Sequence, residues 1–359
     1  MQFTLQFRMS TLPPAPPSNS ANSTQAPSKR PRRLLYLVSA LLFTFTAVLA
    51  HAKDYTRIVV FGDSLSDTGN VAHLTEAKYG IRVPGTIADY TDGRFTDGFD
   101  TIPAAQNYFG VWVEQFAASM PSRPEVKNSL DGGTDYAYGY ATTGSGTGAF
   151  TFGPGDSLSV DVNNMGQQIT DYLATNPKIN NSTLFIIWGG ANDLLQATSP
   201  DAIFTGALQE TTDIQRLIEA GATQFLVLNL PPLGLIPRLN GFPAASLQAD
   251  EASAYYNYYL AIGLSALHDY YHGRHVRIFQ LDVFSLFNQI VTAPADYSLA
   301  NITTSSQGLY AVDPDTYLFW DDLHPTTRGH NILADAAMKL IASPQCDSLG
   351  MPSCAAAAQ

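Results

Sequence analysis

Four short apolar runs, separated by longer helical patterns, limit the possible folds of this chain more than any other feature. The runs read as buried strands and cover residues 57–61, 183–189, 223–230 and 276–282. The helical patterns cover residues 164–175, 201–222, 249–271 and 326–343. Near-continuous apolar strands that alternate with helices are typical of a parallel sheet covered by helices on both faces. The sequence therefore predicts an α/β fold with three layers, α/β/α, around a central parallel sheet.

The stretch from about residue 80 to 160 has a different character. It is rich in Gly, Thr, Tyr and Asp and shows little periodicity. Loops of this length inside a compact domain are uncommon and are usually functional. Its aromatic side chains could line a substrate cleft or pack the loops onto the sheet, and the sequence favours neither. We expect one domain over residues 53–345 with a loop-rich insertion here, followed by a tail over 346–359.

The N-terminal segment is predicted to be removed from the mature protein. Residues 10–28 are rich in Pro, Ser, Asn and Thr and are expected to be disordered. Basic residues between 29 and 33 precede an apolar run from Leu34 to Ala50, which ends in Ala50-His51-Ala52. This layout is typical of a secretory signal peptide, so we expect cleavage near Ala52 and a secreted or periplasmic location. A retained membrane anchor is the alternative, and translation could start at Met1 or Met9.

The net charge of the mature chain limits the classes of molecule that it is expected to bind. Removal of residues 1–52 leaves 14 of the 19 basic residues and all 31 acidic ones, and hence a net charge of −17. An acidic chain of this kind is not expected to bind nucleic acid or to be attracted to anionic membranes. A lipid substrate would have to be captured through apolar contact or as dispersed molecules.

The only two cysteines, Cys346 and Cys354, close a short loop near the C-terminus. In an exported protein this arrangement favours one disulfide, with two free thiols as the alternative. A metal site is not predicted there, because no second pair or neighbouring histidine completes it. No metal or organic cofactor is implied elsewhere.

Polar residues follow the predicted strands, where an open parallel sheet binds its ligands. Gly62, Asp63 and Ser64 come directly after the first strand, and Asn192 and Asp193 follow the second. The third strand is followed by the rigid turn "NLPPLG". We expect these residues to meet at one edge of the sheet.

A serine hydroxyl becomes a nucleophile only when a base takes its proton, and the base needs a partner that fixes its tautomer. The candidate bases after the N-terminal segment are His73, His268, His272, His275, His324 and His330. The three that cluster around residue 270 are expected to lie at a solvated helix end, not at a metal. His324 is the strongest candidate, since Asp321 stands three residues earlier and can turn back to the imidazole in a tight loop.

Acyl transfer also needs hydrogen-bond donors aimed at the developing oxyanion. The Ser64 amide, the Asn192 side chain and a glycine amide in "YAYGYATTG" are candidates. Each has a purely structural explanation when taken alone, for example a helix cap for Asn192. Together they supply a nucleophile, a base, an orienting acid and oxyanion donors on one sheet edge, which is the physical case for a serine hydrolase.

These residues resemble the GDSL lipase/esterase family of the SGNH hydrolase superfamily. "FGDSLSDTGN" contains the first family block, "GGAND" matches the G-x-N-D block, and "WDDLHPT" matches the D-x-x-H-P block. Weaker similarities occur in "GRFTDG", "VWVEQFA" and "LNLPPLG". The resemblance covers about residues 55 to 343, and it implies the flavodoxin-like form of the three-layer fold.

The resemblance implies a role for each matching position. Ser64 would be the nucleophile, His324 the base and Asp321 its orienting acid, with Asp322 a non-catalytic neighbour. Asp63 would brace the turn. The oxyanion donors would be the Ser64 amide, the Asn192 side chain and the Gly139 amide. Where similar proteins carry Gly-Gly, this chain has Tyr140 after Gly139, so Gly144 stays open as an alternative.

The similar proteins that match best are secreted bacterial phospholipases, lecithinases and haemolysin-like lipases. The resemblance thus implies a secreted serine ester hydrolase, a lipase or esterase that cleaves carboxylic esters of lipids or small molecules. It also implies possible transient contact with lipid aggregates and leaves the oligomeric state open. Three alternatives remain: an acyltransferase with a sterol or alcohol acceptor, an acetyl esterase acting on carbohydrate, and a non-catalytic binding protein.

Overall fold

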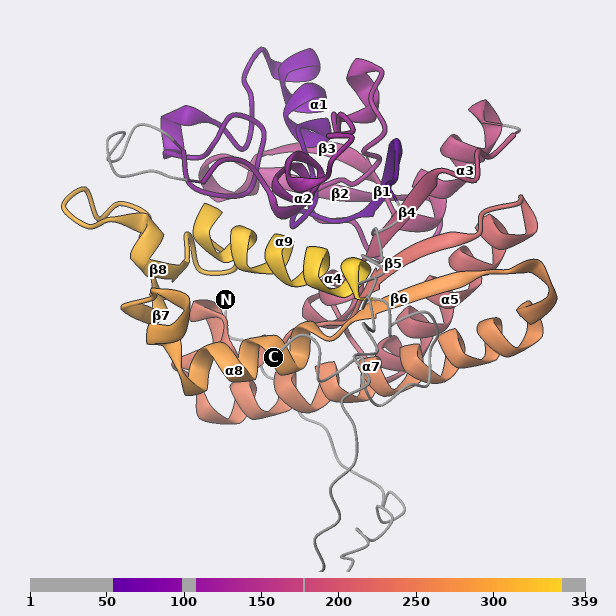
Figure 1. Cartoon of the computed structure of the whole chain (residues 1–359). Coiled ribbons are helices and arrows are strands. Elements are labelled where there is room, and N and C mark those ends of the chain that lie inside the picture. Colours follow the sequence, from indigo (N-terminus) through magenta and orange to yellow (C-terminus); the bar gives the residue numbers. More distant parts are fainter. Residues whose placement is uncertain (1–53, 99–107, 177, 344–359) are drawn as a thin grey trace, which may run out of the picture. The chain divides into compact units, whose positions relative to one another are not determined.

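The four predicted strands form one parallel sheet (Figure 1). In the computed structural model, which describes residues 54–98, 108–176 and 178–343, the strand order is β1-β4-β5-β6. The strands are β1 (Arg57–Gly62), β4 (Thr183–Trp188), β5 (Gln224–Leu228) and β6 (Arg277–Leu281). The described residues all belong to one unit, Ala50–Gln359. The predicted signal peptide and the cysteine pair lie outside the described residues.

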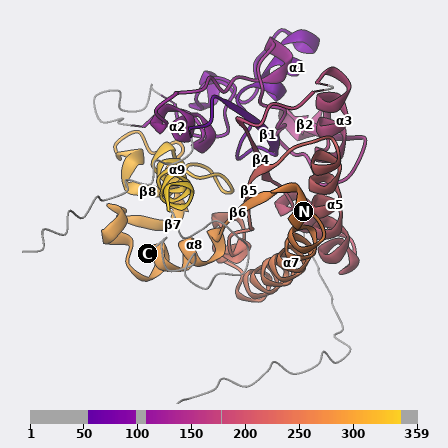
Figure 2. The same cartoon turned by 45° about the vertical axis from the view of Figure 1, so that its right-hand side comes forward.

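Alternating side chains of each strand build two cores, one on either face of the sheet. Ile58 and Val60 of β1 pack on one side with α2 (Trp112–Ser119), α8 (Val283–Thr292) and α9 (Thr327–Ala342). Val59 and Phe61 pack on the other side with α3 (Met165–Thr175), α5 (Asp201–Glu219) and α7 (Pro243–Tyr270). Figure 2 shows the two groups of helices on opposite sides of the strands. The predicted three-layer α/β/α fold is confirmed.

Three predicted helices match α3, α5 and α9 within a few residues at either end. The fourth prediction began too late, at residue 249, whereas α7 begins at Pro243. Proline at the first helical position is favourable because its missing N–H has no partner there anyway. A sequence pattern that treats proline as a helix breaker therefore places the start of α7 too late.

The stretch from 80 to 160 holds more regular structure than its composition suggested. It contains α2, which is buried against α9, and an antiparallel pair of strands, β2 (Thr147–Phe152) and β3 (Leu158–Asn163). Residues 134–138 also run beside β1, because Val60 donates to the Thr134 carbonyl and Tyr136 and Tyr138 donate to β1 carbonyls. This stretch is therefore part of the sheet's edge and of one helical layer.

The remaining elements are short or peripheral. They are α1 (Asn70–Tyr79), α4 (Ala191–Leu195), α6 (Pro237–Asn240), β7 (Asn301–Ser305) and β8 (Tyr317–Phe319), the last two paired in parallel. No helix within the described ranges has the length and apolar composition that crossing a bilayer requires.

Candidate active site

The turn after β1 presents Ser64 at the carboxyl edge of the sheet. Gly62 packs so closely on β4 that an added Cβ would collide with the Trp188 carbonyl oxygen. Asp63 closes the turn, since its side chain accepts the Leu65 amide at 3.0 Å and its carbonyl accepts the amides of the residues three and four positions later. Burial raises the pKa of Asp63 to about 7. Asp63 thus braces the turn, as predicted.

The D-x-x-H loop brings His324 to Ser64. Nε2 of His324 lies 2.8 Å from the Ser64 hydroxyl, and Nδ1 lies 2.7 Å from Oδ2 of Asp321. The two residues that face each other, Ser64 and His324, are 260 positions apart in the chain. Because an ionised carboxylate only accepts hydrogen bonds, the proton sits on Nδ1 and Nε2 is free to accept from the serine. All three side chains are buried.

Asp321 is held in its ionised form. Burial alone would raise its pKa, but the charge of His324 and hydrogen bonds from the ring and from two backbone amides outweigh that effect, so the pKa of Asp321 lies well below its usual value. The amides are those of Leu323 and His324, which donate to Oδ1 at 2.7 and 2.6 Å. The neighbouring Asp322 points elsewhere and pairs with Arg238 at 2.8 Å.

The amide of Gly139 is not placed as predicted. It donates to the buried carboxylate of Asp67 at 2.9 Å and is therefore already used. A side chain at 139 would collide with the Phe95 ring, which accounts for the glycine without an oxyanion role. The next amide, that of Tyr140, makes no hydrogen bond among the described residues, and neither does that of Ser64.

Tyr140 has an unusual backbone conformation for a residue with a side chain. Its φ is +73°, in the left-handed region that glycine adopts easily and other residues rarely do. The following turn keeps it there, because Ala141 donates to the Tyr138 carbonyl and Gln196 donates to the Tyr140 carbonyl at 3.3 Å. Strained backbone of this kind is concentrated at functional sites.

The first turn of α4 is hydrogen-bonded to the loop that follows Tyr140. Asn192 donates one N–H to the Ala141 carbonyl at 3.0 Å, which leaves its second N–H available. Asp193 accepts both the amide and the hydroxyl of Thr143, at 2.9 and 2.7 Å. The G-x-N-D block therefore has two roles. Asp193 holds the loop at Thr143, and Asn192 lines the hollow beside Ser64.

An apolar hollow lies beside Ser64. Large apolar side chains dominate its lining. They come from the turns after β1 and β5, from β4, β8, α4 and α8, and from the D-x-x-H loop: Leu65, Trp188, Leu195, Pro231, Leu233, Ile236, Phe287, Phe319 and Leu323. None of the described residues that line it comes from 80–160. The described aromatic residues of that stretch therefore do not line this hollow.

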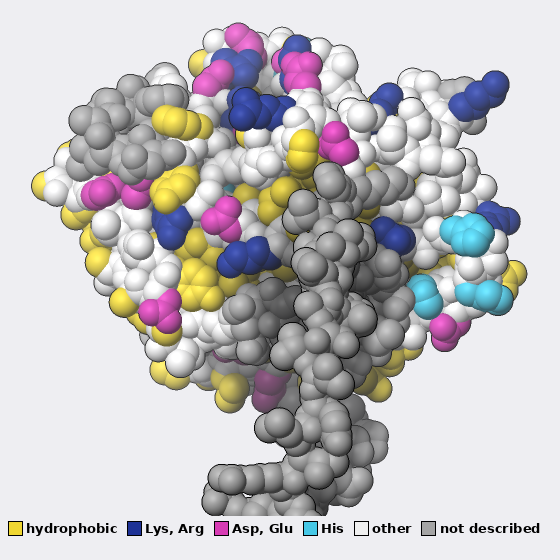
Figure 3. Space-filling model, in the orientation of Figure 1, with side chains coloured by type: hydrophobic (Ala, Val, Ile, Leu, Met, Phe, Trp, Pro, Cys, Tyr) yellow, Lys and Arg dark blue, Asp and Glu magenta, His cyan; other side chains and the backbone are white. Residues whose placement is uncertain are grey.

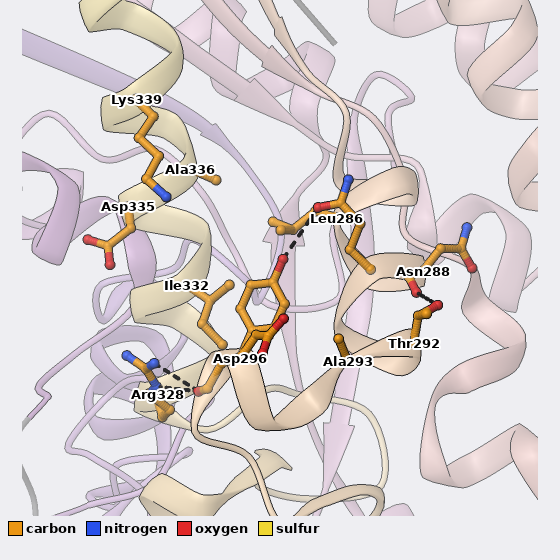
Figure 4. A pocket seen from close by; sticks show the side chains of 12 residues that line it. Leu286, Asn288, Thr292, Ala293, Asp296, Arg328, Ile332, Asp335, Ala336 and Lys339 are labelled. Carbon is orange, nitrogen blue, oxygen red and sulfur yellow. Dashed lines mark hydrogen bonds between the residues drawn. The ribbon is translucent and has the colours of Figure 1, made fainter. Parts of the chain in front are cut away.

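A larger hollow between α8 and α9 contains none of the predicted site residues (Figure 4). Arg328, Asp296, Asp335 and Lys339 lie on its walls, and the Arg328 guanidinium donates to the Tyr297 carbonyl. Size alone thus does not locate the site, because the converging polar groups lie in the smaller hollow.

A family comparison agrees with this geometry. The model of the family described as GDSL-like lipase/acylhydrolase matches residues 58–337, which is more than half of the chain. The chain belongs to this family.

The relatives of the chain are distant in sequence, with identities of 25–27%. An uncharacterized protein of Pseudomonas putida is 27% identical over 334 residues, covering 87% of this chain and 52% of that protein. The phosphatidylcholine-sterol acyltransferase of Aeromonas hydrophila is 25% identical, covering 84% of this chain and 96% of its own. A GDSL esterase/lipase of Arabidopsis thaliana is 25% identical, covering 83% and 90%. The chain spans about half of the first relative and nearly all of the other two. As a GDSL family member, it is an ester hydrolase.

The other histidines that the structure describes in this GDSL protein make no hydrogen bond to Ser64. His73 contacts Asp131 at 3.1 Å. His268 and His272 sit at the end of α7, where Asp269 is their partner, and Figure 3 shows histidine side chains gathered at the surface. Within the described residues, no group of three His, Cys, Asp or Glu side chains is arranged to hold a metal.

His330 is a fully buried residue of the core. Its Nδ1 accepts the Trp112 amide at 3.2 Å, and its Nε2 has no partner among the described residues. Burial, and then the charge of His324, lower the pKa of His330 to about 3. A histidine in an unfolded chain has a pKa near 6.5. On acidification, His330 therefore binds a proton in the unfolded protein before it does so in the folded protein.

His330 should therefore make the protein less stable as the pH falls below about 6.5. Between pH 7 and pH 5, urea unfolding of the wild type should lose about 2 kcal/mol more than unfolding of His330→Gln, which keeps an acceptor but does not titrate. Buried carboxylates with raised pKa values act in the opposite direction and are common to both proteins. Equal losses in the two proteins would contradict this assignment.

Sequence reasoning missed one group of residues at the site. Tyr90, Phe95 and Asp97 lie in the loop before residue 99 and contact the segment from Asp321 to Thr327. The sequence did contain a signal for this group, the weak family similarity "GRFTDG" at residues 93–98, but the similarity assigns no role to these residues.

Proposed function

We propose that this protein is a secreted serine hydrolase that cleaves carboxylic esters of apolar acyl groups through an acyl-serine intermediate. The observation that carries the proposal is the continuous relay from Ser64 through His324 to Asp321 at the mouth of an apolar hollow. The hollow accepts an acyl chain, because its walls offer apolar surface that gains free energy when covered. No metal or organic cofactor is needed for this chemistry.

The reaction runs in two steps. The Ser64 Oγ attacks the ester carbonyl while its proton passes to Nε2 of His324, and Asp321 stabilises the imidazolium that forms. The tetrahedral intermediate collapses, the C–O bond to the alcohol breaks, and Nε2 returns the proton to the leaving oxygen. Water then attacks the acyl-serine by the same route and releases the acid. If an alcohol takes the place of water, the acyl group is transferred instead.

Three donors bind the oxyanion: the Ser64 amide, the second N–H of Asn192 and the amide of Tyr140 in place of Gly139. We assign the Tyr140 amide because it has no hydrogen-bond partner among the described residues and follows immediately after the amide that Asp67 occupies. Donors fixed before the reaction stabilise the developing charge without a reorganisation cost.

A substrate panel tests the proposed function. The purified protein should cleave p-nitrophenyl butyrate and octanoate faster than the acetate, and should prefer phosphatidylcholine or its lyso form to acetylated xylan. The reason is that each buried methylene adds about 0.8 kcal/mol of apolar binding. A preference for acetylated xylan would identify a carbohydrate esterase instead, and the absence of any ester cleavage would end the proposal.

The relative from Aeromonas hydrophila makes acyl transfer the second candidate. With phosphatidylcholine as donor and cholesterol as acceptor, we expect more free fatty acid than sterol ester. An excess of sterol ester would identify an acyltransferase. Export is proposed from residues 29–52 alone, and an extracellular protein whose N-terminus still precedes Ala52 would contradict the predicted cleavage.

A further inference from the structure

A loop that precedes residue 99 is fastened to the segment that carries Asp321 and His324. The Tyr90 hydroxyl donates to Oδ2 of Asp321 at 2.8 Å, and the Thr96 hydroxyl donates to the Pro325 carbonyl at 3.0 Å. The Asp97 carboxylate accepts the amide and the hydroxyl of Thr327, at 2.5 and 2.9 Å. We call residues 90–97 the bracing loop, since these bonds join it to three positions of the other segment, Asp321, Pro325 and Thr327.

The bonds of the bracing loop complete the surroundings of Asp321. Its Oδ1 accepts two backbone amides of its own turn, and its Oδ2 accepts His324 Nδ1 and the Tyr90 hydroxyl. A carboxylate offers about four acceptor positions, so all of them are filled. Three of the four donors come from the D-x-x-H turn itself. The fourth, Tyr90, comes from a residue 231 positions away.

Toward Asp321, the Tyr90 hydroxyl can only act as a donor, because the ionised carboxylate only accepts hydrogen bonds. Burial, followed by the charge of Asp321 and the hydrogen bond to it, raises the pKa of Tyr90 far above its usual value. The hydroxyl therefore keeps its proton over the working range of a serine hydrolase. Its ring is held edge-on against Trp320, with ring centres 6.1 Å apart. Phe95 of the same loop lies against the His324 ring, with centres 5.1 Å apart.

We propose that Tyr90 is a positioning residue, which fixes the Asp321 carboxylate so that it holds the His324 ring toward Ser64. This inference rests on the proposed function. Without the hydroxyl, Oδ2 keeps only one of its two donors, and the carboxylate can turn about its Cβ–Cγ bond. The imidazole then samples orientations in which Nε2 is not aligned with the serine.

Tyr90→Phe removes the hydroxyl and keeps the ring. We expect kcat to fall about fivefold to tenfold with KM unchanged, because the lost bond orients the catalytic groups and does not touch the ester. Tyr79→Phe is the matched control. Its hydroxyl donates to the Ser159 carbonyl at 2.9 Å and not to Asp321, so its loss should lower the melting temperature and leave kcat unchanged.

A double-mutant cycle separates positioning from general packing. In an Asp321→Ala background the hydroxyl has no carboxylate to orient, so adding Tyr90→Phe should lower the residual activity no further. If Tyr90→Phe costs the same factor in both backgrounds, or costs nothing in the wild type, the proposal is overturned.

A spectroscopic measurement distinguishes a failure of this inference from a failure of the proposed function. The proton between His324 Nδ1 and Asp321 should give a low-field ¹H resonance that is absent from His324→Gln. Tyr90→Phe should move this resonance, whereas Tyr79→Phe should not. A protein that cleaves no ester but shows this pattern would retain the positioning role. A resonance unchanged by Tyr90→Phe would refute it, whatever the activity.

Discussion

Replacement of Ser64 by alanine should lower kcat for p-nitrophenyl esters by about 10⁴-fold to 10⁶-fold. Without the hydroxyl no acyl-enzyme can form, and only oxyanion binding and substrate positioning remain. The circular dichroism spectrum and the melting temperature should stay close to those of the wild type. Stopped assays at high enzyme concentration, corrected for spontaneous hydrolysis, can measure a loss of this size.

Ser66→Ala is the matched control for this experiment. Ser66 stands in the same turn and is fully buried, but its hydroxyl accepts the Trp112 indole N–H at 3.1 Å and does not face His324. Its loss should lower stability by about 1–3 kcal/mol, because the indole N–H is left without a partner, and should preserve turnover. A fluorophosphonate should label the wild type and Ser66→Ala once per chain and leave Ser64→Ala unlabelled. Full activity of Ser64→Ala would remove the basis of the proposed mechanism.

Asp321→Asn should lower kcat by about 10³-fold to 10⁴-fold. The asparagine NH₂ group cannot accept from His324 Nδ1, and the lost charge no longer stabilises the imidazolium. The ring then favours the tautomer whose proton sits on Nε2, where it cannot accept from Ser64. Steady-state kinetics at saturating ester should show the loss mainly in kcat.

The adjacent acid provides the control for Asp321. Asp322 is about half exposed and pairs with Arg238 on the surface. Because such exposed pairs contribute about 1 kcal/mol or less, Asp322→Asn should change kcat by less than about twofold. If the two variants lose activity to the same extent, the D-x-x-H loop would be a structural turn and its acid would not be the orienting group.

Much of the fold could be predicted because its signals are local. β1, β4, β5 and β6 consist mostly of apolar residues, the pattern that is typical of buried parallel strands. The misses have local causes as well. The start of α7 was lost because Pro243 was not recognised as a first helical residue. The helix α2 was lost because only eight residues stand between segments rich in glycine and proline.

The residues of the site also differ in how far the sequence predicts them. Ser64, Asn192, Asp321 and His324 carry side chains whose chemistry marks them in the sequence. The oxyanion amide does not, because every residue except proline has an N–H. The bond from Gly139 to Asp67 reveals that the Gly139 amide is occupied, whereas the Tyr140 amide has no partner within the part of the chain that the structure describes.

The sequence by itself determined the sheet, the layers and the side chains that do the chemistry, since apolar periodicity and reactive groups are properties of single segments. Only the tertiary structure decided which backbone amide is available, that Tyr90 shares the Asp321 carboxylate, and that the turns after β5 line the apolar hollow. The physical reason is that a hydrogen bond or a packed wall depends on atoms brought within a few ångströms by folding. Residues 231 positions apart carry no mark of such a contact in their order along the chain.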